Sequence, residues 1–296
     1  MALRTPSPRA ARLSGARAKQ RRLQTTPRAS VGAAIAGGLI AALPASILVD
    51  ELVDRASDRV GRLANAATPQ GQRLYVARPP PAAAPAEAGA PAVVLVHQIF
   101  GLRQREVELC DDLAARGYVA VAPDAFGGAS TGWLPRALAL AYPAALAAGA
   151  DWGVPAVAQA VAWLKQQPGV DPARVCVAGF CFGGASALRY AAAHPGQAAA
   201  AGVFYGRPLE GGGAGAYAPL AGVPVYGVYG GRDGQFSAEV VDGFEAGLEA
   251  AGARPELRRY PAQGHAFVTD IHAARAAGSD ARDAWEGFAD FLSRVL

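Results

Sequence analysis

Cys181 is the residue of this 296-residue chain whose surroundings best suit nucleophilic chemistry. It lies in GFCFGG, residues 179–184, between a valine-rich run and an alanine-rich segment. A glycine on each side of a central nucleophile, between a strand and a helix, is typical of a turn that presents a reactive side chain. Glycine suits this turn because a β-carbon would clash with nearby backbone. The helix dipole would favour a thiolate there. The pattern therefore predicts a cysteine nucleophile that forms a thioester acyl-enzyme.

An acid and a base follow the cysteine in the order that this kind of turn requires. Asp233 lies 52 positions after Cys181, in YGGRDG, and His265 lies 32 positions further on, in GHAF. Taken separately, Asp233 is an ordinary turn residue and His265 an ordinary loop histidine. Their order after the cysteine turn favours a Cys-His-Asp triad, in which the amide of Phe182 would donate to the developing oxyanion.

The other cysteines and histidines are predicted to have structural roles. Cys176 lies inside a predicted strand and Cys110 on a predicted helix, so both should be inert core residues. His97, at the end of an apolar strand, should be a hydrogen-bond donor that supports the site rather than the base. His194 precedes a proline at a helix end and should cap that helix, and His272 is the alternative base.

The elements that must position these residues alternate regularly along the chain. Apolar, β-branched runs predict strands, and segments of helical spacing separate them, which favours a doubly wound, mostly parallel sheet with helices on both faces. The carboxyl-end loops of such a sheet usually form the site. Segment 127–151 breaks the alternation and is expected either to cover a pocket or to pack as a surface excursion. The predicted strands are 72–77, 92–97, 118–122, 174–178, 199–205, 223–229 and 257–260, and the predicted helices are 106–116, 154–167, 185–193, 238–251 and 280–295.

The composition favours a folded domain preceded by a basic tail. Hydrophobic residues make up 52% of the chain and charged residues 18%, which excludes disorder throughout. The formal charge is +4, but residues 1–30 hold eight basic residues and no acid, so the remainder has 20 basic and 24 acidic residues, a net charge of −4. A basic tail alone does not indicate a nucleic-acid-binding domain, so no nucleic-acid partner is expected.

The N-terminal residues have the composition of a targeting signal. Residues 1–49 are predicted to be a targeting or transit segment, with an apolar stretch at 31–49, followed by a polar helical linker at 50–67 and a globular domain at 68–296. Import into a plastid, with a lumen-directed signal, or into another organelle would explain both the basic composition of residues 1–30 and the apolar stretch at 31–49. A membrane anchor or an export signal, through which 31–49 would contact a membrane, and an unstructured extension are the alternatives.

Several of these motifs together resemble the dienelactone hydrolase family, the cysteine branch of the α/β-hydrolases. The resemblance covers about residues 70–296 and rests on HQIFGL (97–102), GFCFGG (179–184), GGRDG (230–234) and QGHAF (263–267). It implies an α/β-hydrolase fold, Cys181 as nucleophile, His265 as base and Asp233 as the residue that orients the base. It also implies Ile99 and Phe182 as backbone oxyanion donors, a small lactone or ester as substrate, and no metal or organic cofactor.

Gln98 is a departure from the family pattern, which has a glutamate at this position that helps to generate the thiolate. A glutamine cannot accept a proton as a base, although it could hydrogen-bond to the thiol or to the substrate. We therefore expect Cys181 to be a thiolate even before substrate binds, stabilised by His265 and by the helix terminus. A thioesterase or acyltransferase, a catalytically inactive binding protein and a redox sensor that uses Cys181 remain as alternatives. Candidate arginines for binding a substrate carboxylate, by their predicted loop positions, are Arg103, Arg105, Arg136 and Arg207.

Overall fold

The computed structural model describes residues 49, 52–53, 56–80, 89–211 and 213–296. The predicted targeting segment, apart from Val49, therefore lies outside the described residues, as does part of the predicted linker. The polar helix expected at 50–67 includes the short helix α3, Arg59–Leu63, and the chain then enters the sheet at Ala66. In the described part of the chain, no helix combines the length and the apolar character that crossing a membrane requires.

An eight-stranded sheet organises the domain, in the order β1-β2-β4-β3-β5-β6-β7-β8. β2 pairs antiparallel with both β1 and β4, and the strands from β4 to β8 pair in parallel. The prediction of a mostly parallel α/β-hydrolase sheet is thereby confirmed. The strands are Ala66–Ala67 (β1), Arg73–Ala77 (β2), Ala90–Val96 (β3), Val119–Pro123 (β4), Val170–Phe180 (β5), Ala200–Phe204 (β6), Pro224–Gly230 (β7) and Arg254–Tyr260 (β8).

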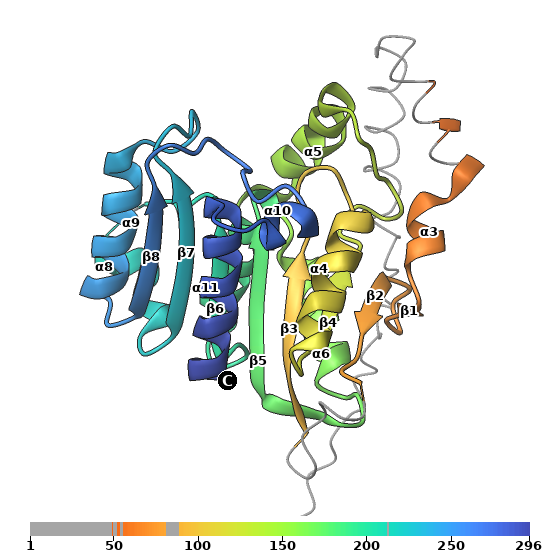
Figure 1. Cartoon of the computed structure of the whole chain (residues 1–296), viewed down its shortest axis with the longest axis horizontal. Coiled ribbons are helices and arrows are strands. Elements are labelled where there is room, and N and C mark those ends of the chain that lie inside the picture. The colour runs from red at the N-terminus through yellow and green to blue at the C-terminus, as the bar shows by residue number, and fades with distance from the viewer. Residues whose placement is uncertain (1–48, 50–51, 54–55, 81–88, 212) are drawn as a thin grey trace, which may run out of the picture. The chain divides into compact units, whose positions relative to one another are not determined.

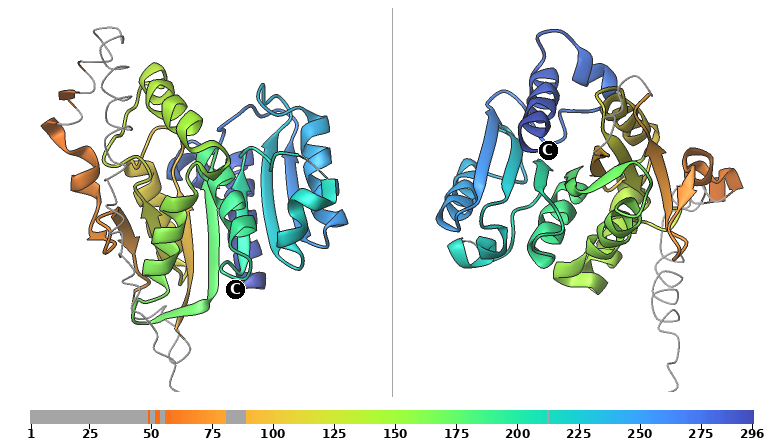
Figure 2. Two further views of the ribbon diagram at one scale, coloured as in Figure 1. Left: turned by 180° about the vertical axis from the view of Figure 1, so that it is seen from behind. Right: turned by 90° about the horizontal axis from the view of Figure 1, so that it is seen from below.

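Helices cover both faces of the sheet (Figures 1 and 2). Successive strand residues point to opposite faces, so apolar runs such as β3 supply two cores at once. Val93 and Leu95 pack toward one face, and Val94 and Val96 toward the other, all with no exposed surface. Residues of Gln104–Ala115 (α4), Ile271–Arg275 (α10) and Asp280–Val295 (α11) complete the first core, and those of Val154–Leu164 (α6), Phe182–Ala193 (α7) and Ala238–Ala250 (α9) the second.

The largest difference from the predicted elements is a helix within 127–151. This segment forms α5, Leu134–Ala148, and a short 3₁₀ helix, Gly149–Asp151. Pro143 lies inside α5 and supplies no backbone donor, which is why the sequence did not predict a helix here. Another short helix, Gly213–Tyr217 (α8), and a 3₁₀ helix, Ala218–Leu220, lie between β6 and β7.

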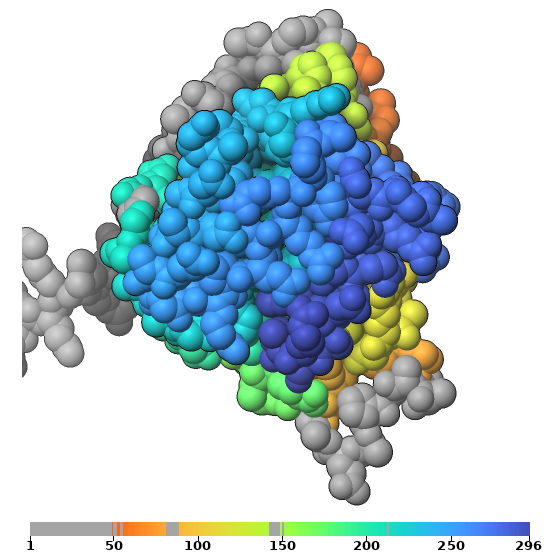
Figure 3. Space-filling model, turned by 60° about the vertical axis from the view of Figure 1, so that its left-hand side comes forward, coloured from red at the N-terminus to blue at the C-terminus, as the bar shows by residue number. Residues whose placement is uncertain are grey.

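The carboxyl ends of the parallel strands carry the residues of chemical interest. Gln98 follows β3, Cys181 follows β5, Tyr205 follows β6, Asp233 follows β7 and His265 follows β8. Because these strands are parallel and each is hydrogen-bonded to the next in the order β3-β5-β6-β7-β8, their carboxyl ends lie along the same edge of the sheet. The C-terminal segments, blue in Figure 3, form one continuous face of the domain.

Candidate active site

Cys181 lies in a strained turn between β5 and α7. Its backbone has φ 53° and ψ −113°, in a region that non-glycine residues rarely adopt, at a typical cost of about 1–3 kcal/mol. Hydrogen bonds from its N–H to the Phe204 carbonyl, 2.8 Å, and from Ala185 N–H to its own carbonyl, 3.1 Å, hold this conformation. A β-carbon on Gly183 would lie 2.2 Å from the Val96 carbonyl oxygen. The glycine requirement predicted for this turn is confirmed.

The surroundings of the Cys181 thiol disfavour its ionisation. Burial raises the pKa of the thiol to about 11, against the opposing effect of a hydrogen bond from the Phe182 amide. The negative charge of Asp233 raises this pKa further, and the positive charge of Arg105 lowers it. The prediction of a thiolate before substrate binds is therefore wrong, because the loss of solvation outweighs the favourable amide at the helix terminus.

Alkylation of Cys181 should depend steeply on pH as a consequence. Because only the thiolate reacts, we expect the second-order rate with iodoacetamide to rise about tenfold per pH unit between roughly pH 7 and 9, without a plateau. Peptide mapping after partial labelling measures the rate at Cys181 separately from the buried Cys110 and Cys176. A rate that is already constant at neutral pH would contradict a protonated resting thiol.

His265 and Asp233 form a close, oriented pair. The distance from His265 Nδ1 to Asp233 Oδ2 is 2.7 Å, and the carboxylate side chain is completely buried. The other Asp233 oxygen accepts the Gln235 N–H at 2.8 Å. A carboxylate oxygen can only accept, so Nδ1 carries a proton, and in the neutral form of the ring Nε2 is then the acceptor. Nε2 is buried and has no hydrogen-bond partner among the described residues. The arrangement leaves an oriented imidazole with its basic nitrogen unused.

His97 is a neutral residue that supports the loop after β3. The backbone N–H of Ala125 donates to His97 Nε2 at 3.1 Å, so the ring proton must be on Nδ1, which donates to the Gln98 carbonyl at 2.6 Å. Complete burial lowers the pKa of His97 and keeps the ring neutral. The prediction that His97 is a supporting donor is confirmed.

Gln98 is buried beside Tyr205. Burial raises the pKa of the Tyr205 hydroxyl, whereas a hydrogen bond from the Gln98 side chain lowers it. The Tyr205 ring also lies 5.2 Å from the His265 ring, measured between centroids. Tyr205 therefore connects the loops after β3 and β8. Sequence reasoning missed it, although its position at the carboxyl end of a predicted strand was a usable signal.

Aromatic side chains surround Phe182, the first residue of α7. Its ring centroid lies 4.3 Å from that of Trp152 and 5.1 Å from that of Phe126. Phe126 in turn meets His97 edge-on at 4.8 Å. These contacts fix the start of α7, and with it the Phe182 amide, against the loops that follow β3 and β4.

Two of the four candidate arginines lie outside the loops in which they were predicted. Arg207 is an exposed loop residue, with its guanidinium 5.8 Å from the Phe236 ring centroid, and Arg103 is also exposed and precedes the first residue of α4. Arg103 is the N-cap of α4, and Arg105 is the second residue of that helix. Arg136 lies on α5, is almost completely buried and donates to the Ser130 carbonyl. The loop positions predicted for Arg105 and Arg136 are therefore wrong.

Cys110, Cys176 and His194 agree with their predicted structural roles. Cys110 and Cys176 are completely buried, and burial raises the pKa of each thiol. His194 is the C-cap of α7, and its Nδ1 lies 3.2 Å from the Tyr190 carbonyl. His272 is exposed on α10, whereas the ring that contacts Asp233 is that of His265. The described residues contain no group of three or more His, Cys, Asp or Glu that could hold a metal ion.

The sheet order, the strained turn after β5 and the helices on both faces define an α/β-hydrolase. Residues 80–296 match the Dienelactone hydrolase family, and the chain belongs to that family. It is an ester hydrolase similar to carboxymethylenebutenolidases.

Relatives and solved structures agree with this assignment. The Rhodococcus opacus carboxymethylenebutenolidase is 31% identical over 222 residues, which cover 69% of this chain and 81% of the relative. An Escherichia coli K12 protein, provisionally given the same name, is 30% identical over 271 residues, or 84% of this chain and 93% of the relative. A Klebsiella pneumoniae crystal structure, provisionally called a dienelactone hydrolase, has a TM-score of 0.62 and 26% identity, and covers 78% of this chain and 96% of the other.

Proposed function

We propose that this protein hydrolyses a small lactone or ester through Cys181, His265 and Asp233. The observation that carries the proposal is the unused, buried Nε2 of His265, whose ring is oriented by Asp233. Cys181 interacts electrostatically with the same aspartate and lies in a strained turn that presents its side chain. A nucleophile, a free base and a residue that orients the base are the groups that covalent acyl chemistry requires.

The acylation step begins from the thiol of Cys181 and the free Nε2 of His265. As the sulfur attacks the substrate carbonyl, its proton passes to His265 Nε2, and the imidazolium is stabilised by Asp233. The amides of Phe182 and Ile99 donate to the oxyanion. Support for the first donor comes from the Phe182 amide, which already hydrogen-bonds to the sulfur. Collapse of the tetrahedral intermediate breaks the ester C–O bond, and the imidazolium returns its proton to the leaving oxygen. The acyl group is then held as a thioester.

The deacylation step uses the same base on water. His265 removes a proton from a water molecule as the water oxygen attacks the thioester carbonyl. The second tetrahedral intermediate expels the sulfur, which recovers the proton from His265, and a carboxylic acid is released. For a lactone, the alcohol and the acid are the two ends of one product. Gln98 takes no proton in this scheme, and its hydrogen bond to Tyr205 gives it an orienting role instead.

Trapping the acyl-enzyme tests the proposed function. Brief reaction of the full chain with p-nitrophenyl acetate, followed by an acid quench, should place one acetyl group on the peptide that contains Cys181 and none on the peptides of Cys110 and Cys176. A panel of small lactones then defines the substrate class, and an added alcohol distinguishes hydrolysis from acyl transfer by its products. An acetyl group on another residue, or turnover without any covalent species, would overturn the proposal.

A further inference from the structure

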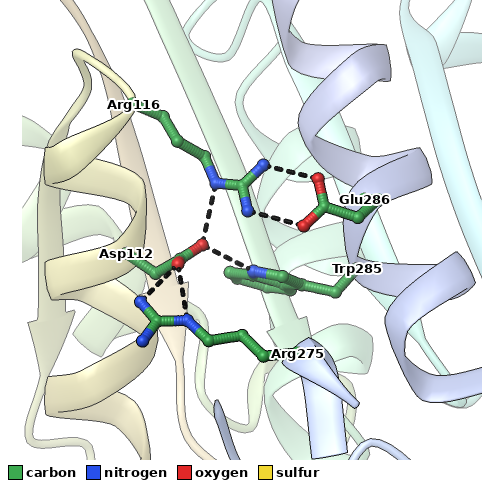
Figure 4. A network of polar contacts seen from close by, with 5 residues as sticks. All are labelled: Asp112, Arg116, Arg275, Trp285 and Glu286. Atoms are coloured by element: carbon green, nitrogen blue, oxygen red, sulfur yellow. Dashed lines mark hydrogen bonds and ion pairs between the residues drawn. The ribbon is translucent and has the colours of Figure 1, made fainter. Parts of the chain in front are cut away.

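Helix α4 holds the segment that follows His265 at two separate places. Arg105 Nε donates to the Thr269 carbonyl at 2.8 Å, and Arg105 Nη2 donates to the Val268 carbonyl at 2.9 Å. Two turns further along α4, Asp112 accepts from Arg275 at 2.8 Å (Figure 4). Residues seven apart lie on the same face of a helix, so α4 presents both anchors to the segment from His265 to the end of α10.

The two anchors differ in what else they contact. Asp112 also accepts from Trp285 Nε1 at 2.9 Å and from Arg116, which itself pairs with Glu286 on α11 (Figure 4). This cluster therefore connects α4, α10 and α11 in the body of the domain. Arg105, by contrast, lies against the nucleophile turn.

The Arg105 guanidinium makes polar contacts through each of its nitrogens and packs on an aromatic ring. Its Nη1 forms a 2.7 Å ion pair with Glu106, and the side chains are only 13% and 2% exposed, respectively. Its central carbon lies 3.9 Å from the ring centroid of Phe180, the residue that immediately precedes Cys181. All three nitrogens therefore have protein partners, and the flat face is covered by an aromatic ring. A group with these contacts is part of the internal framework of the site.

The position of His265 depends on such a framework. Nε2 makes no hydrogen bond among the described residues that would fix it relative to the sulfur, so the ring is held by Asp233, by the rings of Tyr205 and Phe236, and by its own backbone. The next residue, Ala266, has φ 62°, a conformation that persists only where neighbouring contacts impose it. Val268 and Thr269, whose carbonyls Arg105 binds, follow directly, and the Tyr205 hydroxyl also donates to Val268 at 3.2 Å.

We propose that Arg105 is a positioning residue that fixes the His265 loop against the Cys181 turn. The proposal rests on the proposed function, because it assigns Arg105 to the same reaction. One guanidinium binds the backbone three and four residues after the base and packs on the residue before the nucleophile. Arg105 thereby sets the distance between the Cys181 sulfur and His265 Nε2, over which the thiol proton must pass in the proposed reaction. A displacement of about 1 Å in such a geometry typically costs about 10²-fold in rate.

Arg105 also contributes a charge at the sulfur. Asp233 and Arg105 are the charged groups that act on Cys181, and they act in opposite directions. His265 and Tyr205 are further titratable groups that face this turn, and Glu106 is paired with Arg105. Removal of the Arg105 charge therefore leaves the carboxylate unopposed and makes the thiol harder to ionise. The positional and the electrostatic contributions can be separated by two substitutions.

Arg105→Met removes both the charge and the hydrogen bonds, whereas Arg105→Lys keeps the charge but lacks the planar fork that binds two carbonyls at once. With p-nitrophenyl acetate, we expect kcat to fall about 10²-fold in Arg105→Met and about tenfold or more in Arg105→Lys, with little change in KM. At a fixed pH between about 7 and 9, the second-order rate of Cys181 alkylation should fall in Arg105→Met and stay close to wild type in Arg105→Lys. Thermal unfolding of each variant shows whether it is folded. If Arg105→Met does not fold, the kinetics of Arg105→Lys alone test the positioning role.

Arg275→Met is the matched control, since it removes the other arginine anchor of the same segment. We expect it to lower stability while kcat and the alkylation profile stay within about twofold of wild type. Wild-type kcat in both Arg105 variants, or an equal loss of kcat in Arg275→Met, would overturn the positioning role. Neither result bears on the proposed function, which fails separately if acyl trapping finds no adduct on Cys181.

Discussion

Cys181→Ala is expected to lower kcat/KM for p-nitrophenyl acetate by about 10⁴-fold or more. The substitution removes the atom that forms the thioester, and the remaining oxyanion donors and imidazole can only assist direct attack by water. The turn should survive, because alanine retains the β-carbon and the backbone contacts of Cys181 are made by its own N–H and carbonyl. Initial rates across a range of substrate concentrations measure the effect.

Cys176→Ala is the matched control for the nucleophile. Cys176 lies five residues earlier, on β5, and is completely buried, so the variant loses one packed sulfur and about 1 kcal/mol of stability but no group of the site. We expect its kcat/KM to stay within about twofold of wild type. If Cys181→Ala kept a comparable rate, the sulfur would have no part in the reaction, and another nucleophile would have to be sought.

Asp233→Asn should reduce kcat by about 10³–10⁴-fold. In the wild-type protein the buried carboxylate accepts the Nδ1 proton of His265 at 2.7 Å, which leaves Nε2 free to take a proton. An asparagine amide can instead donate to Nδ1 and so favours the tautomer whose proton is on Nε2, where no proton can then be accepted. The asparagine oxygen can still accept the Gln235 N–H, so the local turn is retained.

Asp270→Asn is the corresponding control, because it makes the same change on the loop that carries His265. Asp270 caps α10 by accepting the Ala273 N–H at 2.8 Å, and asparagine is an equally good N-cap. Single-turnover kinetics with both variants should show a loss of the acylation rate in Asp233→Asn only. Equal rates in the two variants would show that orientation of His265 by a carboxylate is not needed for acylation.

Local patterns were sufficient to predict the sheet and the turn at Cys181. Strands such as β3 and β4 are continuous apolar runs because both of their faces are covered, and such runs are visible in the sequence. The glycines around Cys181 were equally informative, since the close approach of Gly183 to β3 excludes any larger residue. The roles assigned to Cys181, His265 and Asp233 stay predictions until they are tested in solution.

Other features depend on contacts that a single sequence does not reveal. The start of α4 was placed too late because its N-cap is Arg103, an unusual capping residue, whose N–H donates to the Glu106 side chain. Arg105 was therefore taken for a loop residue. The raised pKa of Cys181 was missed for a different reason. The burial that raises the pKa of its thiol arises from segments that are distant in the sequence, whereas the helix terminus that favours ionisation is a local feature.

The raised pKa of the Cys181 thiol also bears on how the chain withstands oxidation. Peroxides convert thiolates to sulfenic acids far more readily than they attack thiols, and accessible cysteines are the first to be lost. The other two cysteines of the chain are completely buried, and none of the three forms a disulfide. Under the proposed mechanism Cys181 ionises only as it meets a substrate carbonyl. It would then remain reduced between turnovers, and its rate of oxidation would depend on how often substrate binds more than on the surrounding redox conditions.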